Sequence, residues 1–322
     1  MKERKNSEFR IQNSELRSGK PGRWTALLAV LLAAGCATPK AAQFTDADWV
    51  SQSTTGRGAY ERGDYRRAAE AYGRAERRAR ALDDADALAV AAVNRATCLL
   101  ADGKAADAKA GIDEALSDAR VAQARRAELQ VAAARAELAL GKSAEAIARV
   151  GEALKLEPPP ALKAQALLAK SGAELARENP AAAAKALTDG MSAKEWKGLP
   201  ISLQADQAAL RAQIAVAEKK PAVAMVMQDE AATLWKKADR LPDMARALAE
   251  AGRQAQAADD LAGACDRFYR AARSLWAQGL QPEAVRALEE GIKAAEQLDD
   301  EAVAKKIAAL FVTFKDEQRL DK

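Results

Sequence analysis

The chain has no histidine, only three cysteines, and few aromatic residues, which supply 4% of its 322 positions. Without an imidazole, neither a Ser-His-Asp triad, nor a Cys-His dyad, nor an HExxH zinc site can be built. Valine, isoleucine and threonine, which favour strands, are also scarce, so an all-β fold is excluded. Alanine, the strongest helix former, is abundant at about a quarter of the residues. With 49% hydrophobic and 30% charged residues, the sequence predicts an all-α chain with a buried core.

The sequence also lacks the short motifs that hold phosphates, dinucleotides, structural zinc or an activated serine. It contains no GxxxxGKS/T, no GxGxxG after a strand, no CxxC and no GxSxG. The paired acids Asp83-Asp84, Asp259-Asp260 and Asp299-Asp300 each stand where a helix should open. We expect them to cap free N–H groups there. We therefore predict a protein that is not an enzyme and that uses no metal and no cofactor.

All of the excess charge lies at the N-terminus. Residues 1–24 carry seven basic and three acidic side chains, a net of +4 that equals the value for the full chain. The remainder holds 43 basic and 43 acidic residues and is neutral. With no overall basic field and few rings to stack on bases, we expect no nucleic-acid partner.

The N-terminal segment has the layout of an export signal. Basic residues ending at Arg23 precede an apolar run of eleven residues, Trp24 to Ala34. This run is too short to span about 30 Å of hydrocarbon but is typical of a secretory signal. Its end, Leu32-Ala33-Ala34-Gly35-Cys36, resembles the lipobox of bacterial lipoproteins. A free cysteine at an ordinary cleavage site and a short buried helix are the alternatives.

The lipobox resemblance implies a signal peptide at 1–35, with an overlong basic first part, and an acylated Cys36 as the new N-terminus. Two or more acyl chains suffice for stable anchoring in a membrane. Ala37, in place of an aspartate after the cysteine, implies sorting to the outer membrane, facing the periplasm. Residues 36–47 are expected to be a tether without structure of their own.

Turn signals recur along the rest of the chain at a step of about forty residues. They begin at Gly63, Gly103, Gly141, Asn179, Lys219, Asp259 and Asp299. A second series of breaks falls between them, and each interval of about 14 to 19 residues is apolar with a helical period. Four prolines stand where helices should begin, at Pro180, Pro221, Pro242 and Pro282. The pattern predicts about seven antiparallel helical hairpins in series.

The first hairpin indicates the type of repeat. The stretch Gly63-Asp64-Tyr65-x-x-Ala68-x-x-x-Tyr72-x-x-Ala75 resembles the tetratricopeptide signature, and Gly56 falls at the small position of the preceding helix. Small residues let neighbouring helices approach closely, and a large residue fills the space between hairpins. The residues expected to define the repeat are Gly63, Tyr65, Ala68, Tyr72, Ala75, Gly103, Ala108, Gly141, Ala146, Gly252, Ala264 and Phe268.

This resemblance implies a right-handed α-superhelix, that is, a solenoid. Its step exceeds the tetratricopeptide value of about 34, so we expect helices a turn longer, with a HEAT-like stack as the alternative. The predicted parts are hairpins one to four at 48–190, an irregular join at 191–200, hairpins five to seven at 201–316 and a frayed tail at 317–322. Cys98 and Cys265 lie in helical runs and are expected to be buried and unbridged.

The hollow side of such a superhelix is the candidate binding surface. In tetratricopeptide proteins the first helix of each hairpin lines the groove. This register places Arg57, Tyr60, Glu128, Arg135, Gln213, Arg246 and Arg253 toward the hollow. The arginines are expected to hold a carboxylate or backbone carbonyls, and Tyr60 to supply an apolar anchor. The charged stretch 74–80 is expected to be solvated helix surface.

Together these features predict a non-enzymatic, lipid-anchored adaptor of the bacterial cell envelope that binds an envelope protein or peptide segment. The layout is similar to that of the tetratricopeptide lipoproteins of outer-membrane barrel assembly and of type IV pilus or secretin assembly. Two other hypotheses stay open. One is an envelope enzyme or enzyme regulator that acts on peptidoglycan or polysaccharide through concave carboxylates. The other is a self-associating scaffold with an empty groove.

Overall fold

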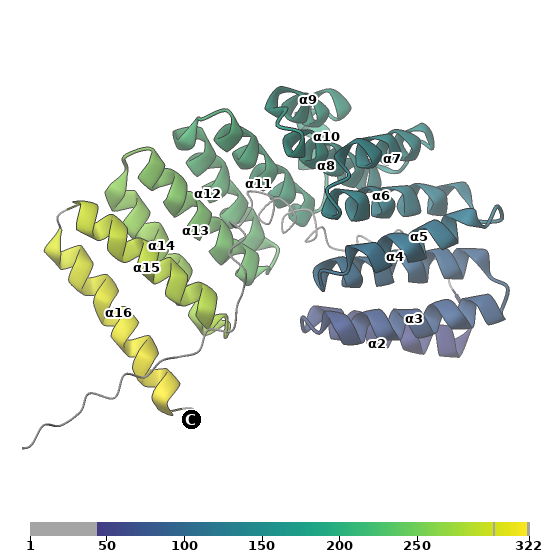
Figure 1. Cartoon of the computed structure of the whole chain (residues 1–322), viewed down its shortest axis with the longest axis horizontal. Helices are drawn as coiled ribbons and strands as arrows, with labels where there is room; N and C mark the ends of the chain where they lie inside the picture. The colour runs from purple at the N-terminus through teal and green to yellow at the C-terminus, as the bar shows by residue number, and fades with distance from the viewer. Residues whose placement is uncertain (1–43, 299, 321–322) are drawn as a thin grey trace, which may run out of the picture.

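The computed structural model describes residues 44–298 and 300–320 (Figure 1). The predicted signal peptide, Cys36 and the tether up to residue 43 lie outside the described residues. Within the described ranges all regular structure is α-helical, as the composition predicts. Most helices pack chiefly on the next one along the chain, so the predicted architecture of a helical solenoid with seven hairpins is confirmed.

The hairpins fall into two arms, which lie beside each other in Figure 1. The N-terminal arm consists of α2 (Ala47–Glu61) with α3 (Tyr65–Ala81), α4 (Ala85–Ala101) with α5 (Ala105–Ser117), α6 (Gln123–Ala139) with α7 (Ser143–Lys155), and α8 (Pro160–Ala176) with α9 (Pro180–Gly190). The C-terminal arm consists of α11 (Ile201–Ala217) with α12 (Pro221–Lys237), α13 (Leu241–Ala257) with α14 (Leu261–Ala277), and α15 (Gln281–Leu298) with α16 (Glu301–Leu320). The short α10 (Ala193–Lys197) lies between the arms.

The forty-residue step has a simple origin in the C-terminal arm. Each of the helices α11, α12, α13 and α14 has 17 residues, and the turns between them have three. Two such helices and two such turns make one step. In the N-terminal arm the second helices are shorter, with 13 residues in α5 and α7 and 11 in α9, and longer joins follow them.

The three-residue turns share one backbone conformation. The residue after each C-cap has a positive φ, for example +78° at Gly63 and +65° at Asp259. The next N–H then bonds back to a carbonyl five residues earlier, as from Asp64 to Ala59 and from Asp260 to Ala255. This is the Schellman arrangement, which satisfies the last carbonyls of a helix.

The predicted helix starts are also present. Asp84 accepts a hydrogen bond from the Ala87 N–H at 2.8 Å, and Asp260 accepts one from Gly263 at 2.9 Å. Asp300 does the same for Val303 at 3.1 Å. All four prolines fall in the first two residues of α9, α12, α13 and α15. Capping, rather than catalysis, therefore accounts for these second aspartates of the pairs.

Within a hairpin, glycine lets a large ring lie against the facing helix. A Cβ on Gly56 would stand 2.8 Å from the Tyr72 ring, and one on Gly252 would stand 2.9 Å from the Phe268 ring. Both distances are too short for any side chain. Five alanines of the expected repeat set are buried in the same interfaces: Ala68, Ala75, Ala108, Ala146 and Ala264. Tyr65 lies at the turn instead, half-buried, with its ring centroid 5.4 Å from that of Tyr60.

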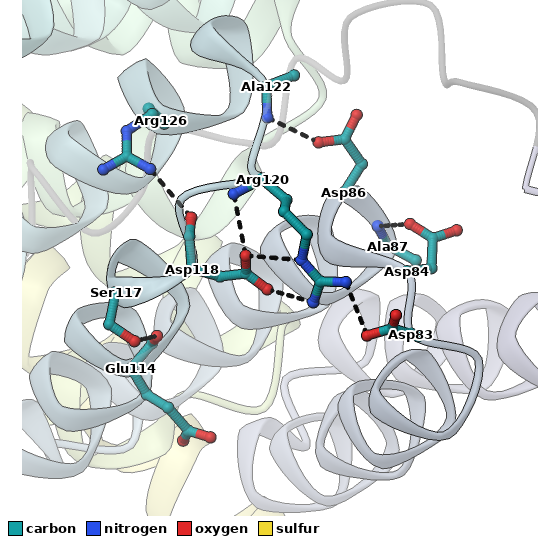
Figure 2. A network of polar contacts seen from close by, with 10 residues as sticks. All are labelled: Asp83, Asp84, Asp86, Ala87, Glu114, Ser117, Asp118, Arg120, Ala122 and Arg126. Carbon is teal, nitrogen blue, oxygen red and sulfur yellow. Dashed lines mark hydrogen bonds and ion pairs between the residues drawn. The ribbon is translucent and has the colours of Figure 1, made fainter.

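The join between α5 and α6 is held by charged side chains rather than by a tight turn (Figure 2). Arg120 pairs with Asp118 at 2.8 Å and reaches Asp83 of the α3–α4 turn, also at 2.8 Å. The hydrogen bond from Arg120 lowers the pKa of Asp118 to about 2. Arg126 donates to the Asp118 carbonyl at 3.0 Å, near the end of α5. The contacts tie consecutive hairpins together at their loop edge.

Two segments are more ordered than the sequence predicts. The join at 191–200 contains α10, opened by a capping box between Ser192 and Glu195, because these residue types satisfy each other's N–H groups. The end of the predicted tether is packed, since Phe44 lies on the Trp49 ring. The last helix, α16, extends to Leu320, and fraying from residue 317 stays a prediction.

Cys98 and Cys265 are both buried, and neither forms a disulfide, as predicted. Burial raises the pKa of the Cys265 thiol. The two residues therefore serve as small packing residues of helices α4 and α14.

Candidate functional site

The first helices of the hairpins are spaced differently in the two arms. In the N-terminal arm α4 packs on α6 and α6 packs on α8, and α8 packs across the join on α11 of the C-terminal arm. In the C-terminal arm α13 packs on α12 and α14, and it meets α15 only at a few positions. A cleft of about 380 Å³ opens there. We call it the inner cleft; it is lined by Ala209, Gln213, Gln228, Trp235, Asp243, Arg246, Ala247, Ala249, Glu250, Arg253, Leu275, Glu283, Arg286, Ala287 and Glu290.

The apolar part of the inner cleft is built from small residues. Ala247 and Ala287 occupy equivalent positions of α13 and α15, forty residues apart, and Leu275 of α14 lies between them in sequence. Trp235 of α12 contributes the one aromatic ring, with the guanidinium of Arg240 stacked 4.2 Å from its centroid. The alanines leave room for side chains of another molecule, and a volume of this size accepts several of them.

The walls of the inner cleft carry a row of ion pairs between α13 and α15. Arg246 holds Glu283 with two hydrogen bonds, of 2.7 Å from Nε and 2.9 Å from Nη2. Two helical turns further along, Arg253 holds Glu290 through Nη1 at 2.9 Å and Glu250 through Nε at 2.9 Å. The expected arginine forks therefore exist, but carboxylates of the same cleft already occupy them.

The ion pair between Arg246 and Glu283 shifts the pKa values of both side chains. The hydrogen bonds that Arg246 donates to Glu283 raise the pKa of Arg246, with smaller contributions from Asp243 and from the phenol of Tyr65. The same bonds lower the pKa of Glu283.

Arg286 differs from the other two arginines of the inner cleft. It is exposed, and no carboxylate among the described residues lies within 4.0 Å of its guanidinium. Its donors are available to a ligand. Sequence reasoning missed Arg286, although it stands forty residues after Arg246, at the same position of the repeat.

Asp206 stands forty residues before Arg246, at the same position of the repeat, and sequence reasoning missed it as well. Asp206 is 1% exposed, and neither of its carboxylate oxygens has a hydrogen-bond partner among the described residues. Burial raises its pKa well above the ordinary value, although Arg240 and Arg135 oppose this shift. Asp206 belongs to α11, the first helix after the join between the two arms.

The structure divides the seven predicted site residues among three places. Gln213, Arg246 and Arg253 line the inner cleft. Arg57 and Tyr60 line a second pocket of about 260 Å³ between α2, α3 and α4, together with Glu61, Tyr72, Asn94, Thr97 and Cys98. Glu128 and Arg135 lie on α6 outside both pockets; burial raises the pKa of Glu128, although Arg125 lies 2.7 Å from it.

Neither a metal site nor a membrane span occurs in the part of the chain that the structure describes. It holds no group of three or more histidine, cysteine, aspartate or glutamate side chains placed to bind a metal ion. No helix among the described residues is both long and apolar enough to cross a membrane.

Comparisons with known proteins give a similarity of fold only. No protein-family model matches the chain, and no curated protein matches it. Among solved structures, the chain is similar to the complex of the TPR2AB domain of yeast Sti1 with pHSP90, at 16% identity and a TM-score of 0.35. The match covers 83% of this chain and 98% of that one. At this identity and TM-score, the similarity says nothing about what the present chain binds.

Proposed function

We propose that the protein is a non-enzymatic adaptor whose inner cleft binds a segment of a partner protein. The observation that carries this proposal is the inner cleft itself, in which equivalent positions of successive first helices converge on one hollow. Repeat proteins form extended binding surfaces in this way, because each repeat adds the same kind of side chain at the same height.

The charge pattern favours recognition by shape and apolar contact. Since Glu283 and Glu290 occupy the forks of Arg246 and Arg253, these walls are neutralised internally. A partner segment gains most by placing apolar side chains over Ala247 and Ala287 and by offering a carboxylate or carbonyl oxygen to Arg286.

The alternative of concave catalytic carboxylates is less well supported by the inner cleft. A general acid needs a raised pKa, whereas the ion pair to Arg246 lowers that of Glu283. Glu250 and Glu290 likewise accept hydrogen bonds from Arg253. These carboxylates are arranged as partners of arginine, which is the arrangement of a binding wall.

The adaptor proposal is tested by reversing one charge in the inner cleft. Partners are crosslinked in intact cells and purified with the protein, its Arg286→Glu variant and its Arg270→Glu variant. Arg270 is an exposed arginine of α14 outside the cleft, so it controls for the change in net charge. We expect an envelope protein to be enriched with wild type and Arg270→Glu and to be depleted with Arg286→Glu. Recovery of no envelope protein above background contradicts the proposal.

We further propose that the adaptor is anchored by acyl chains on Cys36 to the outer membrane, facing the periplasm. The support is the lipobox-like sequence at residues 32–36 behind an eleven-residue apolar run. Mass spectrometry of the mature N-terminus tests this directly. An N-terminal Cys36 with the added mass of acyl chains is expected, and an unmodified or uncleaved N-terminus contradicts the anchor.

A further inference from the structure

The outer face of α3 concentrates positive charge. Between residues 66 and 80, seven positions are not buried, and six of these are arginines. They are Arg66, Arg67, Arg74, Arg77, Arg78 and Arg80, with Glu70 as the seventh. The remaining positions of this stretch are buried, so the arginines share one face of the helix.

Two carboxylates pair with arginines at the edges of this face, and Glu70 lies within it, with no ion pair of 4.0 Å or less among the described residues. Arg78 pairs with Asp46 at 2.7 Å, and Arg80 pairs with Glu114 at 2.8 Å. Arg74 donates to the neutral side chain of Gln52 at 2.6 Å. The four central residues, Arg66, Arg67, Arg74 and Arg77, have no carboxylate of the described residues within 4.0 Å of their guanidinium groups. We call these four the arginine face.

The chain enters the fold beside the arginine face. Phe44 lies on Trp49, with ring centroids 4.4 Å apart, and Asp46 joins the start of α2 to Arg78 through hydrogen bonds of 3.0 and 2.7 Å. Only residues 37–43 separate Phe44 from Cys36. A stretch of this length reaches at most about 25–30 Å when fully extended. A lipid anchor on Cys36 would therefore hold the first hairpin close to the membrane surface.

We propose that the arginine face of α3 binds the phosphate groups of anionic lipids in the membrane that holds the anchor, an inference that rests on the proposed envelope location. A guanidinium presents paired donors that match phosphate oxygens. Basic residues are attracted to an anionic surface within a Debye length, about 10 Å at moderate salt. An acyl anchor and a basic patch together hold a protein more firmly than either alone. The contact fixes the first hairpin as the membrane-facing end of the solenoid.

The test measures binding to vesicles without the acyl anchor. The chain from Cys36 onward is produced in unacylated form; it contains every core cluster of the fold, all of which lie within the described residues. Sedimentation is compared for vesicles of phosphatidylglycerol mixed with phosphatidylcholine and for vesicles of phosphatidylcholine alone. One variant changes Arg66, Arg67, Arg74 and Arg77 to Gln. A matched variant changes Lys236, Lys237, Arg270 and Arg273, four exposed cations of α12 and α14, to Gln.

The expected result is salt-sensitive binding to the anionic vesicles only. Because each basic residue near an anionic surface contributes roughly fivefold, the quadruple α3 variant should bind at least about tenfold more weakly, and the matched variant like wild type. No binding by wild type, equal binding to phosphatidylcholine, or an equal loss in both variants would overturn the inference. Since the assay contains no acyl chain, its failure is separate from failure of the anchor, which mass spectrometry reports.

Discussion

Phe268 is completely buried, and glycines of two neighbouring helices make room for it. A Cβ on Gly252 would stand 2.9 Å from the Phe268 ring. A Cβ on Gly291 would stand 3.1 Å from the Cβ of Phe268. Gly56 and Tyr72 repeat the arrangement in the first hairpin. In a core made largely of alanine, these few rings fill the volume that small residues leave, so their glycine partners are under strong steric restriction.

The first prediction concerns this restriction. Gly252→Ala should lower the free energy of unfolding by about 1–3 kcal/mol, because the added methyl group meets a ring that cannot move away. Gly151→Ala is the matched control: it lies in α7, and its added methyl group would have no contact within 4 Å outside its own helix, so the helix should gain up to about 1 kcal/mol. Denaturant unfolding measures both. A neutral or stabilising Gly252→Ala would contradict the close packing.

A second prediction at this scale concerns Asp206. Burial raises its pKa in the folded protein, so stability that is present below the ordinary carboxyl pKa is lost as the pH rises through the raised value. Asp206→Asn removes this loss, since the amide stays neutral. The variant should melt higher than wild type at neutral pH and like wild type in acid, as judged by Tm across pH.

The control for Asp206 is Asp266→Asn, at an exposed position of α14. Its Tm difference from wild type should stay small at every pH. The opposite outcome is that Asp206→Asn has the same Tm difference from wild type in acid as at neutral pH. That result would mean that the Asp206 carboxyl does not change its protonation in the folded state, and it would contradict the raised pKa of Asp206.

At the scale of elements, the sequence predicts the hairpins well because turn chemistry is local. Glycine, aspartate and proline at a forty-residue spacing report the positive φ and the helix starts that the structure contains at Gly63, Asp260 and Pro221. The sequence does not reveal which first helices separate and which pack together. The separation of the first helices depends on how long α5, α7 and α9 are compared with α12 and α14. It therefore depends on contacts between residues that are distant in the sequence.

The candidate site is predictable only in part for the same reason. Three of the seven residues that the helical register selects, Gln213, Arg246 and Arg253, line one cleft, and their role in binding stays a prediction. It gives no sign that Glu283 and Glu290 occupy the arginines, because those carboxylates lie 37 residues away on another helix. Counting one repeat of forty residues forward and back from Arg246 gives Arg286 and Asp206.

A third prediction concerns the positive-φ residues of two turns that share one backbone conformation. Lys219 has a φ of +60° and Gly279 has a φ of +73°, the region that favours glycine. Lys219→Gly should stabilise the protein and Gly279→Lys should destabilise it, each by about 1 kcal/mol. No atom lies within 4 Å of a Cβ on Gly279, so only the backbone can be responsible. Equal changes of Tm in the same direction would refute the shared turn geometry.

At the scale of the whole molecule, α11 joins the two arms through opposite faces. It gives Leu203, Leu210 and Ile214 to the core of the N-terminal arm and Ala205, Ala208 and Ala209 to that of the C-terminal arm. Trp196 of α10 reinforces the join: it is buried and donates from Nε1 to the Leu187 carbonyl at 3.2 Å. The solenoid should therefore unfold cooperatively across the join.

The fourth prediction concerns a substitution that weakens the join between the arms. Trp196→Ala should cost about 3–5 kcal/mol, because a large buried ring is lost, and should separate the unfolding of the two arms into two transitions. Lys194→Ala, an exposed position of the same helix, should leave a single transition. Calorimetry distinguishes the cases. One unchanged transition in Trp196→Ala would mean that the arms are coupled elsewhere.

The central claim is that a partner segment lies in the inner cleft, and site-specific photocrosslinking in intact cells tests it most directly. A photoreactive residue is placed at Arg286, whose exposed side chain lines the cleft, or at Arg270, whose exposed side chain does not. The account predicts a protein adduct from position 286 and none from position 270. Adducts of equal yield from both positions, or adducts from position 270 alone, would contradict it.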